Sequence, residues 1–230
     1  IYLLVKQDIH DVIDGCEVVH ADTLHATATV KAIAEHADAP YSLIYTKTSE
    51  LSLGYFALER MLQIAENTGA GMVYSDHYRV KNGKKINSPV ITYQKGSLRD
   101  DFNFGPVLLY KTTALKKAVK NMDANYQYAG LYDLRLRVSR LAELVHINEY
   151  LYTEIEHDDR KSGETIFDYV DPKNRAMQIE MEQACTDHLK QIGAYLKPEF
   201  KKVDFNQEKF EYEASVIIPV RNRIRTITDA

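Results

Sequence analysis

The sequence Ser215-Val216-Ile217-Ile218-Pro219-Val220-Arg221-Asn222 stands close to the end of this 230-residue chain. Its apolar, β-branched run ends at a proline and a polar turn. That pattern is typical of a buried strand that ends at a phosphate- or base-binding loop, with a helix to follow. The stretch therefore predicts the opening strand of an α/β domain, most of which would lie beyond residue 230. On this interpretation the chain is a fragment of a longer protein.

Strand and helix patterns alternate through the preceding residues. Short apolar runs predict strands at 2–5, 17–20, 41–45, 72–75, 107–110 and 145–152. Apolar residues at helical spacing predict helices at 27–36, 53–68, 113–121, 130–144 and 172–194. Asn82-Gly83 predicts a hairpin turn, and the polar residues 153–171 predict an exposed loop. Alternating strands and helices indicate an α/β fold with a mainly parallel sheet.

Composition narrows the class of protein. The net charge of −4 and the pI near 6.1 argue against a nucleic-acid-binding protein, which usually has a basic excess. No apolar run reaches the roughly 18–20 residues that a membrane-spanning helix needs. Cys16 and Cys185 have neither metal-ligand spacing nor a disulfide framework, which predicts a cytoplasmic protein. The sequence leaves self-association into a homo-oligomer open.

The stretch from Ser215 to Asn222 resembles a motif of family-two glycosyltransferases. Residues 215–222 match "S-V-I-I-P-x-Y-N", the usual first strand of that family, except that Arg221 replaces Tyr. Weaker matches precede it in the family's order: residues 41–55 resemble "Y-I-L-F-L-D-x-D-D-x-L…G-Y-L", residues 72–78 resemble "V-V-Y-S-D", and residues 130–136 resemble "E-D-x-D-L-x-L-R". The chain thus resembles a bacterial glycosyltransferase of polysaccharide or glycan synthesis.

This resemblance implies a fold and a division into domains. Residues 1–170 would form a three-layer, mainly parallel α/β domain of the nucleotide-diphospho-sugar transferase type (GT-A), followed by a C-terminal helical extension. Residues 171–213 would hold that long helix and a linker, and residues 214–230 would begin a second, truncated domain of the same type. In the family the partners are a nucleotide sugar and a glycan acceptor. Pro219, Arg221 and Asn222 would bind the donor in the second domain.

The family's metal-binding turn is degenerate here. Aspartates in the "D-x-D" turn hold a divalent cation that neutralises the donor diphosphate. The corresponding positions carry Thr46 and Thr48 on either side of Lys47. Hydroxyls are poor ligands for a hard divalent cation, so no metal or other cofactor is expected in this part of the chain. Mg²⁺ or Mn²⁺ would belong to the missing second domain.

The same segment carries the candidate donor-binding residues of the first domain. Lys47 could replace the cation at a diphosphate, with Thr46 and Thr48 beside it. Asp76, at a predicted strand end, is a weaker candidate for the same site.

Asp133 is the candidate general base, because Tyr132-Asp133 stands where the family has Glu-Asp. The alternative is structural: an acid in the first turn of a helix that complements the helix dipole and pairs with Arg137 at i+4. The sequence favours this alternative.

We therefore expect this part of the protein to be a non-catalytic, pseudo-enzyme module of a glycosyltransferase. One alternative is an active, metal-independent glycosyltransferase that uses Lys47 and Asp133. Another, from a different class, is a glycan- or protein-binding assembly module.

Overall fold

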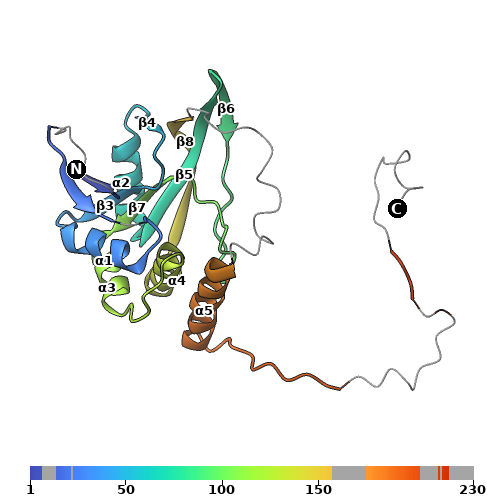
Figure 1. Ribbon diagram of the computed structural model, residues 1–230. Helices are drawn as coiled ribbons and strands as arrows, with labels where there is room; N and C mark the ends of the chain where they lie inside the picture. Colours follow the sequence, from blue (N-terminus) through green and yellow to red (C-terminus); the bar gives the residue numbers. More distant parts are fainter. Residues whose placement is uncertain (7–13, 22, 157–174, 203–211, 213, 218–230) are drawn as a thin grey trace. The chain divides into compact units, whose positions relative to one another are not determined.

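The main structural feature of residues 1–195 is a six-stranded mixed sheet with helices on both faces. The computed structural model of the protein describes residues 1–6, 14–21, 23–156, 175–202, 212 and 214–217. The chain divides into two units, Ile1–Tyr195 and Leu196–Ala230. The first unit contains these elements (Figure 1): β1 (Tyr2–Val5), β2 (Glu17–His20), α1 (Thr27–His36), β3 (Tyr41–Tyr45), β4 (Glu50–Leu53), α2 (Ala57–Thr68), β5 (Met72–Lys81), β6 (Lys84–Ser88), β7 (Val107–Lys111), α3 (Thr112–Lys120), α4 (Gly130–Leu141), β8 (Leu144–Glu156) and α5 (Arg175–Gln191).

The main sheet has the strand order β3-β7-β5-β8-β4, and β6 pairs with the far half of β5. Within this sheet, as far as the structure describes it, β5 and β8 pair in parallel, and the pairs β3–β7, β7–β5, β5–β6 and β8–β4 are antiparallel. Strands β1 and β2 form a separate parallel pair. The predicted α/β class is confirmed, but the sheet is mixed rather than mainly parallel.

The sheet is mixed because of the way the chain connects its strands. Between β5 and β7 the chain forms a hairpin and a long loop, without the helical crossover that a parallel connection normally uses. The hairpin is the one predicted by Asn82-Gly83, whose two residues both adopt positive φ, at 51° and 73°. Strand β7 therefore returns in the opposite direction and lies between β3 and β5.

Each face of the sheet is covered by its own apolar cluster. Helices α1, α3 and α4 pack on one face around Met72, Tyr74 and Tyr110. Helix α2 packs on the other face, where Met61 meets Val73. Side chains of β5 alternate between the two clusters, as the period of two in a strand requires. Among the residues described, no helix is long and apolar enough to cross a membrane.

Two predicted boundaries move because strand pairing extends further than the apolar pattern. Residues 50–53 form β4, which pairs with the end of β8, so helix α2 begins at Ala57 rather than at Leu53. Tyr55, predicted on the buried helix face, is consequently exposed. Residues 153–156, predicted as loop, continue β8. The remainder of that predicted loop, together with residues 172–174 of the predicted long helix, lies outside the described residues.

Residues 215–222, which carry the predicted opening strand, belong to the second unit. Val216 and Ile217 are 84% and 87% exposed and form no strand, contrary to the prediction of a buried strand at these two residues. A strand requires a neighbour for its backbone groups, and the described residues of this unit provide no strand partner. Pro219, Arg221 and Asn222 lie outside the described residues. The second domain that they would begin stays a prediction.

Helix α5 docks on α4 within the first unit. Ala184 and Cys185 pack against Tyr132 and Leu136, as the predicted apolar face of this helix requires. The His188 side chain accepts a hydrogen bond at Nδ1 from Arg140, 2.8 Å away. Burial, followed by the charge of Arg140, lowers the pKa of His188 to about 4, which keeps the imidazole neutral and able to accept this bond.

A carboxylate fixes the register of this docking. Glu180 of α5 accepts hydrogen bonds from the backbone N–H groups of Gln127, Tyr128 and Ala129 at 3.1, 2.7 and 3.2 Å. These groups directly precede α4, where the helix dipole favours a negative charge. Glu180 therefore joins the start of α4 to the middle of α5.

Substitution of Glu180 by alanine tests this contact. We expect Glu180→Ala to lower the free energy of unfolding by about 2 kcal/mol, because three hydrogen bonds to a charged acceptor are lost, one of them from the partly buried N–H of Ala129. Urea denaturation measures the change. Glu182→Ala, at an exposed position of the same helix, is the matched control and should change stability by less than about 0.5 kcal/mol. Equal effects of the two variants would contradict the assigned role of Glu180.

Candidate functional site

Three strands of the main sheet end at the same edge. Strand β3 is antiparallel to β7, β7 is antiparallel to β5, and β5 is parallel to β8, so β3, β5 and β8 run in one direction. Ligands of α/β proteins commonly bind at the edge where such strands have their carboxyl ends. Polar residues gather there: Lys47 follows β3, Arg79 lies in the last part of β5, and Glu154 in the last part of β8.

A hollow of about 350 Å³ opens at this edge, and we call it the strand-end cavity. The strand ends, the end of β6 and the loop before β7 supply its walls. Its lining residues are Thr46, Lys47, His77, Arg79, Ser88, Phe102, Asn103, Phe104, Gly105, Pro106, Leu108 and Glu154.

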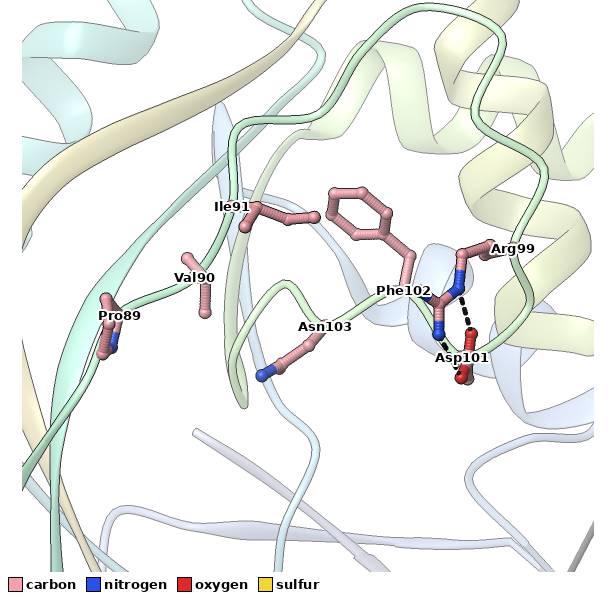
Figure 2. Close-up of a pocket in the computed structure, with 7 residues that line it drawn as sticks. All are labelled: Pro89, Val90, Ile91, Arg99, Asp101, Phe102 and Asn103. Carbon is pink, nitrogen blue, oxygen red and sulfur yellow. Dashed lines mark hydrogen bonds and ion pairs between the residues drawn. The ribbon is translucent and has the colours of Figure 1, made fainter. Parts of the chain in front are cut away.

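A second hollow of about 220 Å³ adjoins the first, since Phe102 and Asn103 line both. Figure 2 shows this loop cavity, which is also lined by Pro89, Val90, Ile91, Arg99 and Asp101. Arg99 and Asp101 form a two-point ion pair in the same loop, at 2.9 and 2.7 Å. The guanidinium lowers the pKa of Asp101 through these bonds. Charge at this end of the loop is thereby satisfied within the loop itself.

Arg135 of α4 holds that loop in place. Its guanidinium donates hydrogen bonds to the carbonyl oxygens of Ser97 and Arg99 at 2.8 and 2.6 Å. It also lies 4.9 Å from the centre of the Tyr132 ring and 5.7 Å from that of Phe104. The loop that lines both cavities is thus anchored by a buried cation from the helical layer.

Glu154 is the buried anion of the strand-end cavity, with only 4% of its surface exposed. Ser49 donates a hydrogen bond to Oε1 at 3.1 Å. Its other oxygen, Oε2, lies 3.7 Å from Arg79 Nε and 3.9 Å from His77 Nε2. A buried carboxylate needs such partners, and here they are contributed by the neighbouring strand β5 and the β3–β4 connection.

His77 is the second buried polar group of the cavity, 2% exposed. Its ring stacks on that of Tyr152, with centroids 5.0 Å apart and planes 5° apart. Its Nδ1 has no hydrogen-bond partner among the residues that the structure describes. Burial lowers the pKa of His77, the Arg79 and Lys47 charges act in the same direction, and the Glu154 and Asp76 carboxylates oppose them. The imidazole is therefore neutral at pH 7.

The predicted donor-binding residues separate in the structure. Thr46 and Lys47 line the strand-end cavity, and Thr46 is fixed by hydrogen bonds from its backbone N–H and hydroxyl to the carbonyl of Pro106, at 2.9 and 3.3 Å. Lys47 is exposed at the rim. Thr48 is exposed and lines neither cavity.

Asp76 has a structural function on the opposite face of β5 from His77. Its Oδ1 accepts hydrogen bonds from the Val90 N–H at 2.8 Å and from His146 Nε2 at 2.9 Å. The other nitrogen of His146 bonds to the Thr92 hydroxyl at 3.0 Å. Asp76 lines neither cavity and instead ties residues 90–92 to β5 and β8.

Asp133, the candidate base, is held in an ion pair. Its two oxygens accept hydrogen bonds from Arg137 Nε at 2.8 and 2.9 Å, and the residue is 3% exposed. This confirms the predicted pairing at i+4. Burial raises the pKa of Asp133, and Arg137 opposes that change. Asp133 lines neither cavity, so the structure does not bring it together with Lys47 there.

Arg79 and Glu154 were not among the site residues predicted from the sequence. Glu154 fell in a predicted loop, whereas in the structure burial alternates over residues 152–155, with Tyr152 and Glu154 buried. Among the described residues, no group of three or more His, Cys, Asp or Glu side chains could hold a metal ion.

Comparison with protein-family models gives no match for this chain, and comparison with curated proteins gives none either. The function proposed below therefore depends on the site geometry and on the sequence resemblance.

Gly105 provides a test of how tightly the cavity wall is packed. Its φ is +74°, and a Cβ there would run into the Tyr152 hydroxyl and lie 3.3 Å from His77 Nδ1. Gly83, with φ +73° and open space around it, shares the backbone cost but not the clash. We expect Gly105→Ala to destabilise the protein by about 3 kcal/mol and Gly83→Ala by about 1 kcal/mol, both measured by urea denaturation. Similar losses would show that the wall around His77 is loosely packed.

Proposed function

We propose that the Ile1–Tyr195 unit is a GT-A-like module that binds the diphosphate of a nucleotide sugar in the strand-end cavity, without a metal ion and without transferring the sugar. It would serve bacterial polysaccharide or glycan synthesis. The observation that carries this proposal is the position of Lys47: it follows β3, where the resemblance places the metal-binding turn, and it lines a cavity at the carboxyl ends of three co-directional strands.

The charges of the cavity favour an anion. Lys47 and Arg79 are cationic, Glu154 is the lining carboxylate, and His77 is neutral at pH 7. The lining therefore carries a net charge of about +1, concentrated at the exposed rim by Lys47 and Arg79. Ammonium and guanidinium groups form strong charge-assisted hydrogen bonds with phosphate oxygens.

Two placements favour binding over sugar transfer. The two oxygens of Asp133 are engaged by Arg137, away from both cavities. Glu154, the carboxylate that does line the strand-end cavity, is held by Ser49 and flanked by Arg79. A general base has to reach the acceptor hydroxyl, and neither carboxylate is free to do so. A cytoplasmic location remains a prediction from the cysteine content.

A glycan- or protein-binding assembly module is the second candidate. Tyr55 and Phe56 project from the start of α2 with most of their surface exposed, their rings 5.5 Å apart. Phe56 has a positive φ of 54°, which is uncommon for a bulky residue and concentrates at functional positions. Exposed aromatic rings of this kind suit a sugar face or a partner surface.

Titration with nucleotide sugars tests the proposal. We expect uridine or guanosine diphosphate sugars to raise the melting temperature of the protein saturably, to the same extent with and without manganese. Lys47→Ala should weaken the affinity at least about fivefold, because a cation facing the diphosphate is lost. Isothermal calorimetry measures that loss.

Lys95→Ala is the matched control, since Lys95 is exposed, lines neither cavity and lies 3.8 Å from the Glu143 carboxylate. It should leave the affinity unchanged. Manganese-dependent binding would contradict the proposed metal-free site. Absence of binding to any donor would favour the assembly module.

A further inference from the structure

We infer that ligand binding in the strand-end cavity is coupled to protonation of His77, so that the site holds a diphosphate ester more tightly as the pH falls. This inference rests on the proposed function, because it assumes that the ligand is an anion bound beside Lys47 and Arg79. It adds a regulatory property that the sequence resemblance does not imply.

The imidazole of His77 is placed where a bound ligand would affect its protonation. His77 lines the cavity, is almost fully buried, and keeps Nδ1 without a partner among the described residues. A buried polar atom without a partner is costly, and once it is protonated Nδ1 carries an N–H that a ligand oxygen can accept. The stacked Tyr152 ring holds the imidazole in one orientation.

The charges of the ligand and of the cavity lining do not balance unless His77 is protonated. A diphosphate esterified at both ends carries two negative charges, whereas the unliganded lining carries a net charge of about +1. Binding would leave about one negative charge uncompensated in a partly buried site. A proton on His77 removes that excess, since the imidazolium is then surrounded by a bound anion and by Glu154, 3.9 Å away.

Charges of both signs surround His77, so an added charge can change its protonation state. Both signs of charge face it, from β5, from β8 and from the segment after β3: Asp76, Arg79, Glu154 and Lys47. Burial and the two cations keep the pKa of the free protein's imidazole below its usual value, and the two carboxylates oppose them. An added anion works with the carboxylates and shifts the balance toward the protonated form.

The direction of the pH dependence follows from this balance. Binding of the anion raises the pKa of His77, so the complex takes up a proton over the pH range between the free and bound pKa values. Affinity then increases as pH falls through that range, by at most tenfold per pH unit for a single group. Folding stability changes in the opposite sense: because burial lowers the pKa of His77 in the folded protein, this residue makes the protein less stable as pH falls below about 6.5.

The experiment uses UDP-glucose, whose phosphates are both esterified and lack the ionisation near pH 6 that a terminal phosphate has. Calorimetry at about pH 8 and about pH 6 measures the affinity, and repetition in two buffers of different ionisation enthalpy measures the protons taken up. We expect binding to be at least about threefold tighter at about pH 6, with a measurable fraction of one proton taken up.

His77→Gln keeps a polar side chain that cannot become charged in this range. It should lose both the pH dependence and the proton uptake. His36→Gln is the control: His36 lies on α1, bonds to the carbonyl of Ala32 and lines neither cavity, so this variant should behave like the unmodified protein.

The outcomes separate the two proposals. Binding with equal affinity at both pH values and no proton uptake would overturn the coupling and leave the proposed function intact. Proton uptake that persists in His77→Gln would assign it to another group and also overturn the inference. Absence of binding to UDP-glucose and to a guanosine diphosphate sugar at both pH values would overturn the proposed function as well. If His77→Gln does not fold, the proton count on the unmodified protein still decides between coupling and its absence.

Discussion

The candidate site depends on the parallel pairing of β5 with β8, and in particular on its register. Ser75 lies opposite Ile147, but two residues later His77 lies opposite Tyr152 and Arg79 opposite Glu154. The register shifts on both sides of Asp76 insert extra residues of β8 at this point. Continued at the register of Ser75, the pairing would place Glu149 beside His77 and Leu151 beside Arg79. The irregularity therefore places the Tyr152 ring against His77 and brings the Glu154 carboxylate into the cavity beside Arg79, as β-bulges near functional sites commonly do.

The same bulge explains why Asp76 and His77 serve different purposes although they are adjacent. Asp76 accepts hydrogen bonds from Val90, which follows β6, and from His146 of β8. His77 faces the cavity and retains a nitrogen without a partner among the described residues. One face of β5 thus contributes rigidity and the other contributes the groups that a ligand can engage. The buried Glu154 keeps the cavity polar, at the desolvation cost that a buried ion requires and that Ser49 and Arg79 offset.

Much of the fold could be predicted from local patterns, because strands of β-branched residues and the Asn82-Gly83 turn depend on neighbours in the sequence. Strand direction could not, since it depends on whether a helix crosses between strands, and the segment between β6 and β7 has no helical period. The pairing of Asp133 with Arg137 was predictable for the same local reason. Arg79 and Glu154 were not, because their proximity depends on a bulge between strands that are far apart in the sequence. Lys47 was found through the resemblance; it lines the strand-end cavity, and its contact with a ligand stays a prediction.

A crystal structure of the protein with UDP-glucose would locate the diphosphate. We expect its density at the strand-end cavity, within hydrogen-bonding distance of Lys47 Nζ or Arg79, with no metal ion between the phosphates and the protein. Diphosphate density beside Asp133, or bound at the strand-end cavity only through a divalent cation, would contradict this expectation.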